Sequence, residues 1–169
     1  MEILFTNTYV RNKKLAQEIY RYFCFRRRLI IVCYVLMAIT FLLNLILLAF
    51  GESPEPFTII FPVVFIILMI LSYFSQVNAM IKRDLEVHGQ EISVKTIVTD
   101  AYIENTASTG SVNQIEYNKI RYAVQTRNLI LLRSKANLIY IFRKDTFEVG
   151  TKEEFISFLK GKGIPIRGK

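Results

Sequence analysis

Two long runs of apolar residues dominate the first half of the chain. Leu29 to Phe50 is 22 residues without a charged side chain. At about 1.5 Å per helical residue this run reaches about 33 Å, which exceeds a hydrocarbon core of about 30 Å. A second run, Phe57 to Ile81, follows after the short segment GESPEP. The pattern predicts a two-helix transmembrane hairpin over residues 29–81, with spans at 29–50 and 57–78 and the connector 51–56 outside.

The segment before the first run, residues 1–28, predicts a strand followed by an amphipathic helix. EILFT at positions 2–6 is typical of a short strand, and Asn7 or Thr8 is a suitable cap for the helix after it. Apolar residues then recur at helical spacing at Leu15, Ile19, Tyr22 and Phe23. Two positions for this helix stay open: on the cytoplasmic leaflet, or packed on a globular domain.

Beyond Asp84 the pattern changes to short alternating segments. They are rich in Val, Ile, Tyr, Thr and Phe and are separated by turn sequences; they read EISVKTIVT, AYIENTAS, SVNQIEYNKI, RYAVQT, LILLRS and LIYIFRK. Alternation puts Ile120, Tyr122 and Val124 on one face, and Arg121, Ala123 and Gln125 on the other. The continuous runs 129–132 and 138–142 indicate central strands covered on both faces. We expect an antiparallel meander of five to seven strands.

A helix closes the chain. Thr151 followed by Glu154 is a capping box, Gly161 or Gly163 supplies the stop, and the apolar stripe between them is Phe155, Ile156, Phe158 and Leu159. Antiparallel strands closed by one amphipathic helix are the plan of a pleckstrin-homology-like domain. The predicted fold class is therefore a membrane α-helical hairpin plus an α+β domain over 82–169, a small antiparallel sheet or barrel with a C-terminal helix.

The charge distribution predicts the orientation in the membrane. The chain has 22 Lys and Arg against 14 Asp and Glu, a net charge of +8. The excess of positive charge flanks the two spans, whereas the connector contains two glutamates and no Lys or Arg. The positive-inside rule therefore predicts a multi-pass protein of the cell membrane, with both termini and the C-terminal domain in the cytoplasm. The same rule accounts for the basicity without nucleic acid, so no nucleic-acid partner is predicted.

The chain resembles the YcxB-like bacterial membrane proteins over essentially its entire length. The resemblance is carried by the two adjacent spans, by IEYNKI leading into RYAVQTRNLILLRS, by LIYIFRKDTF and by the terminal helix EEFISFLKGKG. Many members have a Trp in the IEY motif, where this chain has Tyr117, and a Pro before a basic residue, where it has Phe142 and Arg143. The resemblance implies the fold and the membrane location. It transfers no catalytic residue, because the family's molecular activity is unassigned.

The residues available for chemistry do not form the pattern of an enzyme. His88 is the only histidine, and the glycines form neither a phosphate-binding loop nor a dinucleotide fingerprint. Asp100, Glu104 and Glu116 are candidate carboxylates, although exposed strands commonly present such residues as solvated charges. We therefore predict no enzyme, no cofactor, no metal site and no small-molecule substrate.

Binding is the predicted class of function. The candidate binding surface consists of polar and basic residues of the C-terminal domain: Arg121, Gln125, Arg127, Arg133, Lys135, Arg143 and Lys144. The domain is expected to dock a protein partner, by strand addition at a sheet edge or in the groove beside the terminal helix. Headgroup sensing, in which the cations of this surface meet the anionic leaflet of the lipid bilayer, is one alternative. Self-protection against a toxin or bacteriocin, acting through the hairpin, is another.

Within the spans one polar side chain stands out. Asn44 is the only strongly polar residue of the first span. A polar group in a bilayer is usually satisfied by a neighbouring helix, so Asn44 is expected in helix packing, either against the second span or in self-association with a second copy. Neither span contains an ionisable residue of the kind that transport requires.

Overall fold

The computed structural model describes residues 2–25, 28–53 and 56–168 and divides the chain into two compact units. Unit 1 combines residues 1–12 with residues 84–169, and unit 2 is Lys13–Arg83. Residues 26–27 and 54–55, which belong to the predicted N-terminal segment and to the predicted connector, lie outside the described residues. The predicted segment 1–28 is thus shared between the two units.

Unit 2 is helical. It contains α1 (Lys13–Phe25), α2 (Arg28–Ala49) and most of α3 (Pro56–His88). Two helical segments, Ile30–Ala49 and Pro56–Glu86, are long and apolar enough to cross a membrane. Only 6% of each is buried, unlike the core helix of a soluble protein, which suggests a membrane location. The helix α3 continues beyond the predicted span to His88, where Gly89 ends it at a φ of 69°.

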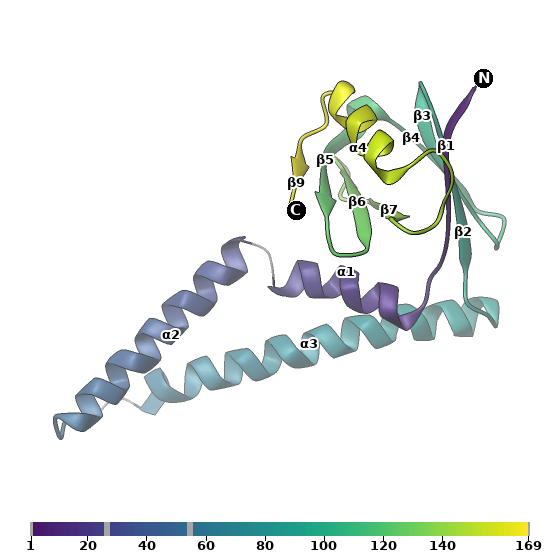
Figure 1. Ribbon diagram of the computed structural model, residues 1–169. Helices are drawn as coiled ribbons and strands as arrows, with labels where there is room; N and C mark the ends of the chain where they lie inside the picture. Colours follow the sequence, from purple (N-terminus) through teal and green to yellow (C-terminus); the bar gives the residue numbers. More distant parts are fainter. Residues whose placement is uncertain (1, 26–27, 54–55, 169) are drawn as a thin grey trace. The chain divides into compact units, whose positions relative to one another are not determined.

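Unit 1 is built from two sheets (Figure 1). The first has the order β4-β3-β2-β1-β8 and the second the order β7-β6-β5-β9. The strand bounds are β1 Ile3–Val10, β2 Ser93–Thr99, β3 Tyr102–Ala107, β4 Val112–Glu116, β5 Ile120–Gln125, β6 Leu129–Ser134, β7 Ile139–Arg143, β8 Phe147–Val149 and β9 Ile166–Arg167. The pairs are antiparallel except β5 with β9, which is parallel.

The core of unit 1 lies between the two sheets and under the C-terminal helix α4 (Lys152–Gly161), as Figure 1 shows. Phe155 and Leu159 of α4 are fully buried there, and the Phe155 ring lies 4.5 Å from the Phe142 ring. The capping box is present: Thr151 accepts a hydrogen bond from the Glu154 N–H, and the Glu154 carboxylate accepts one from the Thr151 N–H. The α+β layout with a terminal helix is therefore confirmed.

The N-terminal strand is longer than predicted and is central in its sheet. It pairs with β2 along its length, from Ile3 opposite Thr99 to Val10 opposite Ser93, and with β8 on its other side. Asn7 is fully buried inside this strand, and α1 begins only at Lys13, so the prediction of a helix cap at Asn7 or Thr8 is wrong. The reason is a tertiary hydrogen bond: the Asn7 side chain binds the backbone of β7.

The predicted single strand SVNQIEYNKI is two strands joined by a corner. A 3-10 turn, Tyr117–Lys119, separates β4 from β5 and passes the chain from one sheet to the other. Tyr117 is anchored at this corner because its hydroxyl donates to the carbonyl oxygen of Thr99 and its ring lies 5.5 Å from the Phe158 ring. These contacts come from distant segments and have no local signal.

The predicted alternation of β5 is wrong from Tyr122 onward, because the register against β6 shifts between Ile120 and Tyr122, which is a β-bulge. The bulge turns Ala123 inward, so that Ala123 joins Ile120 in the core instead of sharing the face of Arg121. Residues 129–132 of β6 are all buried and β6 is central, as predicted, whereas β7 is the edge of its sheet and not a central strand.

Candidate functional site

The predicted binding surface divides into two groups at opposite ends of β6. Arg127 lies in the turn before β6, beside Lys144, whose ammonium donates to the carbonyl oxygen of Thr126 at 2.7 Å. Arg133 and Lys135 lie at the other end of the strand, and Arg121 is near them because Ile120 pairs with Ser134. Six strand residues span about 20 Å. Gln125 and Arg143 belong with the first group, by position on β5 and β7.

Several of these predicted side chains already have partners inside the domain. Arg143 forms two hydrogen bonds to the Asp145 carboxylate, at 2.6 and 3.1 Å, and this contact holds the pKa of Asp145 below its usual value. Arg133 donates to the side-chain oxygen of Asn137. These contacts hold the guanidinium groups of Arg143 and Arg133 within their own turns. Because the two groups of residues also lie at opposite ends of β6, they do not form one continuous basic patch.

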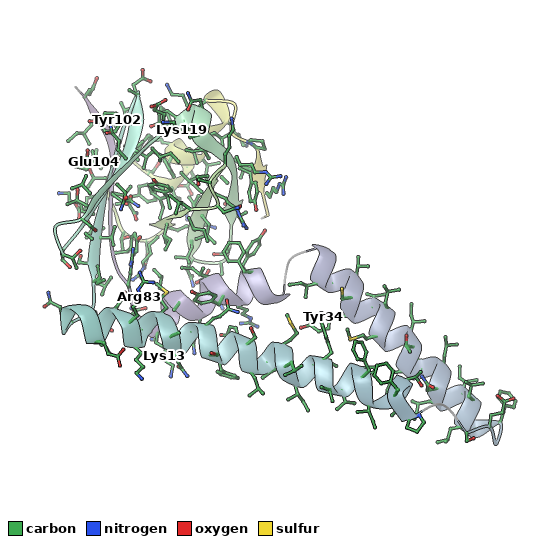
Figure 2. All side chains as sticks on the ribbon, turned by 180° about the vertical axis from the view of Figure 1, so that it is seen from behind. Lys13, Tyr34, Arg83, Tyr102, Glu104 and Lys119 are labelled. Atoms are coloured by element: carbon green, nitrogen blue, oxygen red, sulfur yellow. The ribbon has the colours of Figure 1, made fainter. Side chains whose placement is uncertain are left out.

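The three candidate carboxylates do not converge either. Asp100 binds the ammonium of Lys162 at 2.6 Å, in the loop between β2 and β3. Glu116 accepts hydrogen bonds from Lys119 and Asn118, which lower its pKa. Figure 2 shows Glu104 on β3 and Lys119 at the corner after β4. Asp100 and Glu116 thus belong to separate surface contacts, and Glu104 lies on another strand, an arrangement that provides no paired acid and base.

Asn44 lies in a contact between α2 and α3 of unit 2. Its side-chain oxygen accepts a hydrogen bond from the Thr58 hydroxyl at 2.7 Å, and its amide donates to the carbonyl oxygen of Thr40 at 2.8 Å. Asn44 is buried, with 7% of its surface exposed. The amide is therefore satisfied within one chain, by its own helix and by the other helix of the pair.

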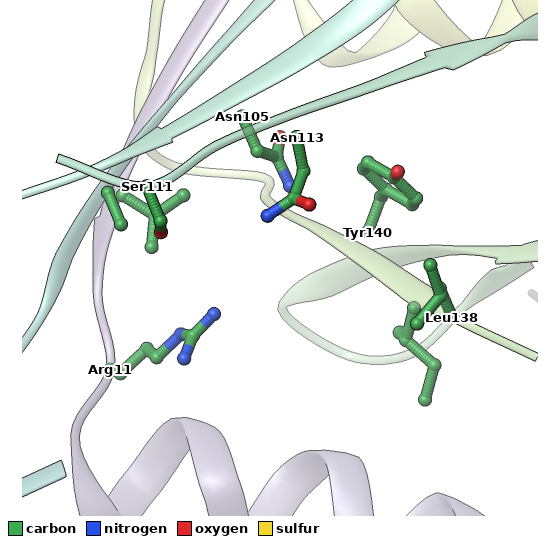
Figure 3. A pocket seen from close by; sticks show the side chains of 9 residues that line it. Arg11, Asn105, Ser111, Asn113, Leu138 and Tyr140 are labelled. Atoms are coloured by element: carbon green, nitrogen blue, oxygen red, sulfur yellow. The ribbon is translucent and has the colours of Figure 1, made fainter. Parts of the chain in front are cut away.

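A cavity of about 190 Å³ lies in unit 1, where the two sheets separate (Figure 3). Its walls come from β2, β3 and β4 of the first sheet, from the beginning of β7 in the second sheet and from Arg11, the residue after β1. The side chains that give it chemical character are Arg11, Asn105, Ser111, Asn113, Leu138 and Tyr140. Figure 3 shows the Arg11 guanidinium directed into the space that the two asparagines border from the opposite side.

Arg11 carries the positive charge of this cavity. It follows β1 directly and its N–H binds the carbonyl oxygen of Ile92 at 2.9 Å, so the backbone that holds it is fixed. Its guanidinium lies 4.0 Å from the Asp84 carboxylate, the outer limit of an ion pair, and its Nε is buried without a partner among the described residues. The nearby Tyr9 hydroxyl has a pKa raised by burial, which the Arg11 charge partly offsets.

The size and donors of the cavity define what it accepts. A cavity of about 150 Å³ holds one benzene ring, whereas drug-sized ligands occupy about 300 to 1,000 Å³. A guanidinium and two side-chain amides are hydrogen-bond donors that bind a carboxylate. The arrangement therefore accepts one acidic side chain or one chain terminus, and it is too small for a nucleotide or a dinucleotide.

The residues that line this cavity could not be grouped from the sequence. Arg11 precedes Asn105 and Asn113 by more than ninety positions, and none of the three lies in a recognisable motif. Arg11 also belonged to a segment predicted as helix, after a cap at Asn7 or Thr8, whereas in the structure it directly follows the strand β1. The one available signal was the alternation of β1, which extends past Thr6 through Tyr9 if the capping interpretation is set aside.

The described residues thus define an α+β chain in which a two-sheet unit with a capped terminal helix accompanies two long apolar helices. The chain matches no family model, no curated protein and no solved structure.

Proposed function

We propose that the protein is a membrane-anchored docking module, whose cytoplasmic domain holds a partner protein by an acidic anchor residue. The observation that carries the proposal is the Arg11 cavity, because it combines a guanidinium with an unpartnered Nε, two asparagines and the volume of a single side chain. A charge-assisted hydrogen bond to a guanidinium is worth about 1.5–3 kcal/mol, so one anchor residue contributes measurable affinity.

The position of the cavity in the chain supports a role near the membrane. Arg11 lies two residues before α1, and Val94 of the cavity wall lies two residues into β2, the first strand after α3. In the sequence, both connections between unit 1 and the apolar helices therefore begin within a few residues of the cavity lining.

The pairing of β1 with β2 supports an even number of membrane crossings. These strands flank the apolar helices in sequence yet pair directly, from Ile3 opposite Thr99 to Val10 opposite Ser93. Since both strands belong to one sheet, the chain has to leave and return on the same side of a membrane. Spans at 29–50 and 57–78 satisfy this condition, and the acidic connector between them fits the outer side.

The resemblance to the YcxB-like family and to the pleckstrin-homology-like plan stays a prediction. It is supported by the order of elements: two long apolar helices, two sheets that are antiparallel except for the β5–β9 pair, and one capped C-terminal helix. In this plan the hairpin takes the place of the loop between the first two strands.

Photocrosslinking in native membranes tests the docking proposal. A photoreactive residue at Leu138, an exposed residue on the rim of the cavity, is expected to capture one recurrent protein. Arg11→Gln is expected to lower the captured amount about tenfold, the effect of losing about 1.4 kcal/mol. Arg121→Gln, at an exposed cation on β5 outside the cavity, is the matched control and is expected to leave the capture unchanged.

A second variant separates binding from folding. Arg11→Gln leaves Asp84 without the Arg11 guanidinium, whereas Asn113 is exposed and removing its amide breaks no hydrogen bond among the described residues. Asn113→Ala is therefore expected to lower capture while the unfolding temperature stays unchanged. Adducts with lipid alone, or capture that is insensitive to both variants, would refute the acidic-anchor proposal; lipid adducts would favour headgroup sensing.

The orientation has its own test. With Cys24 and Cys33 replaced by alanine, a single cysteine at Glu52 in the connector is expected to react with an impermeant thiol reagent in intact cells. A single cysteine at Lys135, in the β6–β7 turn, is expected to react only after the cells are permeabilised. The opposite pattern would place the domain outside and contradict the proposed topology.

A further inference from the structure

The amide of Asn105 is held in one orientation at the wall of the Arg11 cavity. The Thr96 hydroxyl, opposite it on the neighbouring strand β2, donates to the Asn105 side-chain oxygen at 2.7 Å. Thr96 is fully buried, so its hydroxyl is fixed in place. With the oxygen occupied, the nitrogen of Asn105 is directed toward the space that Arg11 faces, as Figure 3 shows. Asn105 therefore offers the cavity an N–H donor and not an acceptor.

The Arg11 guanidinium supplies the charge that an anion requires. A guanidinium carries N–H donors in a planar fork, and the Nε of Arg11 is buried without a partner among the described residues. The Asp84 carboxylate lies 4.0 Å from the guanidinium, which is beyond hydrogen-bond distance, and it does not line the cavity. Donors thus face the cavity from two sides, an arrangement that suits the two oxygens of a carboxylate.

The remaining wall of the cavity is apolar. It consists of Val94, Ala107, Leu138, Ile139 and the ring of Tyr140. Leu138 has 58% of its surface exposed, so an apolar group that covers it removes apolar surface from water. The cavity therefore matches a ligand that carries a carboxylate and an apolar group next to each other.

The volume of the cavity limits the size of this ligand. A dry cavity of about 150 Å³ holds benzene, which corresponds to about 25 Å³ for each non-hydrogen atom. The cavity of about 190 Å³ then holds about seven or eight such atoms. An aspartate or glutamate side chain brings only about four or five, and no apolar end. The last residue of a chain brings its Cα, its carboxylate and its side chain, which together make about seven atoms for valine and about eight for leucine.

We propose that the carboxylate bound by Arg11 is the free C-terminus of a partner chain that ends in valine, leucine or isoleucine. The α-carboxylate binds Arg11 and the Asn105 amide, and the branched side chain packs against Leu138. The exposed residues Ser111 and Asn113 form an open rim, through which the preceding residues of the partner reach solvent. The inference rests on the docking proposal and specifies its anchor as a chain terminus instead of an acidic side chain.

Fluorescence anisotropy with short labelled peptides and the full chain in detergent micelles tests the inference. The peptides consist of glycine and serine and differ only at the last residue, and only the binding that Arg11→Gln removes is counted. A free leucine end is expected to bind at least about tenfold more tightly than the same end amidated, because the amide lacks the charge. A free glycine end leaves the apolar wall uncovered and a free tryptophan end exceeds the volume, so both are expected to bind about tenfold more weakly than leucine.

Two variants on the protein side test the apolar contact. Leu138→Ser is expected to weaken binding of the leucine-ended peptide about fivefold and to leave the glycine-ended peptide unchanged. Val149→Ser, at an exposed apolar residue of β8 outside the cavity, is the matched control and is expected to change neither affinity. Both side chains are exposed, so the unfolding temperatures of the two variants are expected to equal that of the original chain.

A peptide with an internal glutamate and an amidated end distinguishes this inference from the docking proposal. It is expected to bind at least about tenfold more weakly than the leucine-ended peptide. If it binds as tightly, and Arg11→Gln removes the binding of both peptides, the docking proposal holds and the assignment of a chain terminus is wrong. If no peptide shows binding that depends on Arg11 at millimolar concentrations, both proposals are wrong.

Discussion

Replacing Asn7 tests the link between the N-terminal strand and the second sheet. Its side chain forms two hydrogen bonds with one residue of β7: the amide donates to the carbonyl oxygen of Arg143 at 2.8 Å, and the side-chain oxygen accepts from the Arg143 N–H at 3.0 Å. Asn7 is fully buried. It thereby satisfies the edge of β7 in the way that a neighbouring strand would.

The expected cost of Asn7→Ala follows from these two bonds. Each intramolecular hydrogen bond contributes about 1 kcal/mol net, and a polar group left unsatisfied in the interior costs about 1–3 kcal/mol. Two backbone groups of Arg143 lose their partner at once, so the variant is expected to lower the free energy of unfolding by about 2–4 kcal/mol. That is a large part of the roughly 5–15 kcal/mol of an ordinary domain.

Asn7→Asp separates the tertiary role from a helix-capping role. Aspartate is as good a helix cap as asparagine, so a cap would tolerate the change. At the buried position of Asn7, an aspartate would place a carboxylate oxygen against the Arg143 carbonyl oxygen and would lack the N–H donor of the amide. We expect destabilisation at neutral pH and partial recovery as the pH falls, because burial raises the pKa of the new carboxyl group and the protonated form can donate.

The assay is thermal and denaturant unfolding of the full chain in detergent micelles, followed by near-ultraviolet circular dichroism. Asn113→Ala is the matched control, since Asn113 is an exposed asparagine in a strand of the same unit. A loss below about 0.5 kcal/mol for Asn7→Ala, the range of ordinary surface substitutions, would refute the reasoning. So would an Asn7→Asp variant as stable as the original chain.

Three further outcomes are expected. Deleting residues 13–88 joins Asn12 to Gly89 and leaves a loop of six residues between β1 and β2, residues 11–12 and 89–92. The product is expected to be a water-soluble β-rich domain by circular dichroism, and an aggregated or unfolded product would contradict the autonomy of unit 1. Burial raises the pKa of Tyr117 in the folded chain, so above about pH 10 the phenol of the unfolded chain loses its proton first, and the stability of the fold decreases as the pH rises. Unfolding temperatures measured between about pH 9 and 11 are expected to decrease less steeply for Tyr117→Phe. Gly150→Ala places its new methyl group 2.4 Å from the Phe5 ring at a φ of 74°, and is expected to lower the free energy of unfolding by about 2–4 kcal/mol. Gly110→Ala is the control: Gly110 has a φ of 84° but open space around it, so the expected loss is only about 1 kcal/mol.

The features that the sequence predicts well are those that arise within a few residues. The apolar lengths of the two long helices, the buried run of β6 and the capping box between Thr151 and Glu154 depend on local composition and spacing. The features it misses depend on distant partners. The corner at Tyr117 is held by Thr99 and Phe158, and the bulge of β5 is visible only against β6.

The same distinction explains why the sequence groups basic residues that the structure separates. Basic residues were grouped because they are close in sequence on β5, β6 and β7, but a strand separates its two ends by its own length, so Arg127 and Arg133 lie at opposite ends of β6. The cavity, in contrast, collects Arg11, the residue after β1, and residues from β2, β3, β4 and β7. Its formation requires the end of β1 to be placed beside β2, which no local pattern indicates.

The insertion of the helices between two paired strands also connects the folding of the two units. The strand β1 is made before the apolar helices and β2 after them, so the central pair of the first sheet cannot form until residues 13–92 have been made. If these helices enter a membrane, their ends have to be returned to one side before β1 can pair, and a chain with one helix left outside the bilayer lacks a complete first sheet. Formation of the β1–β2 pair then depends on correct insertion of both helices. Because Arg11, the residue after β1, lines the cavity, the cavity exists only in chains in which this pair has formed.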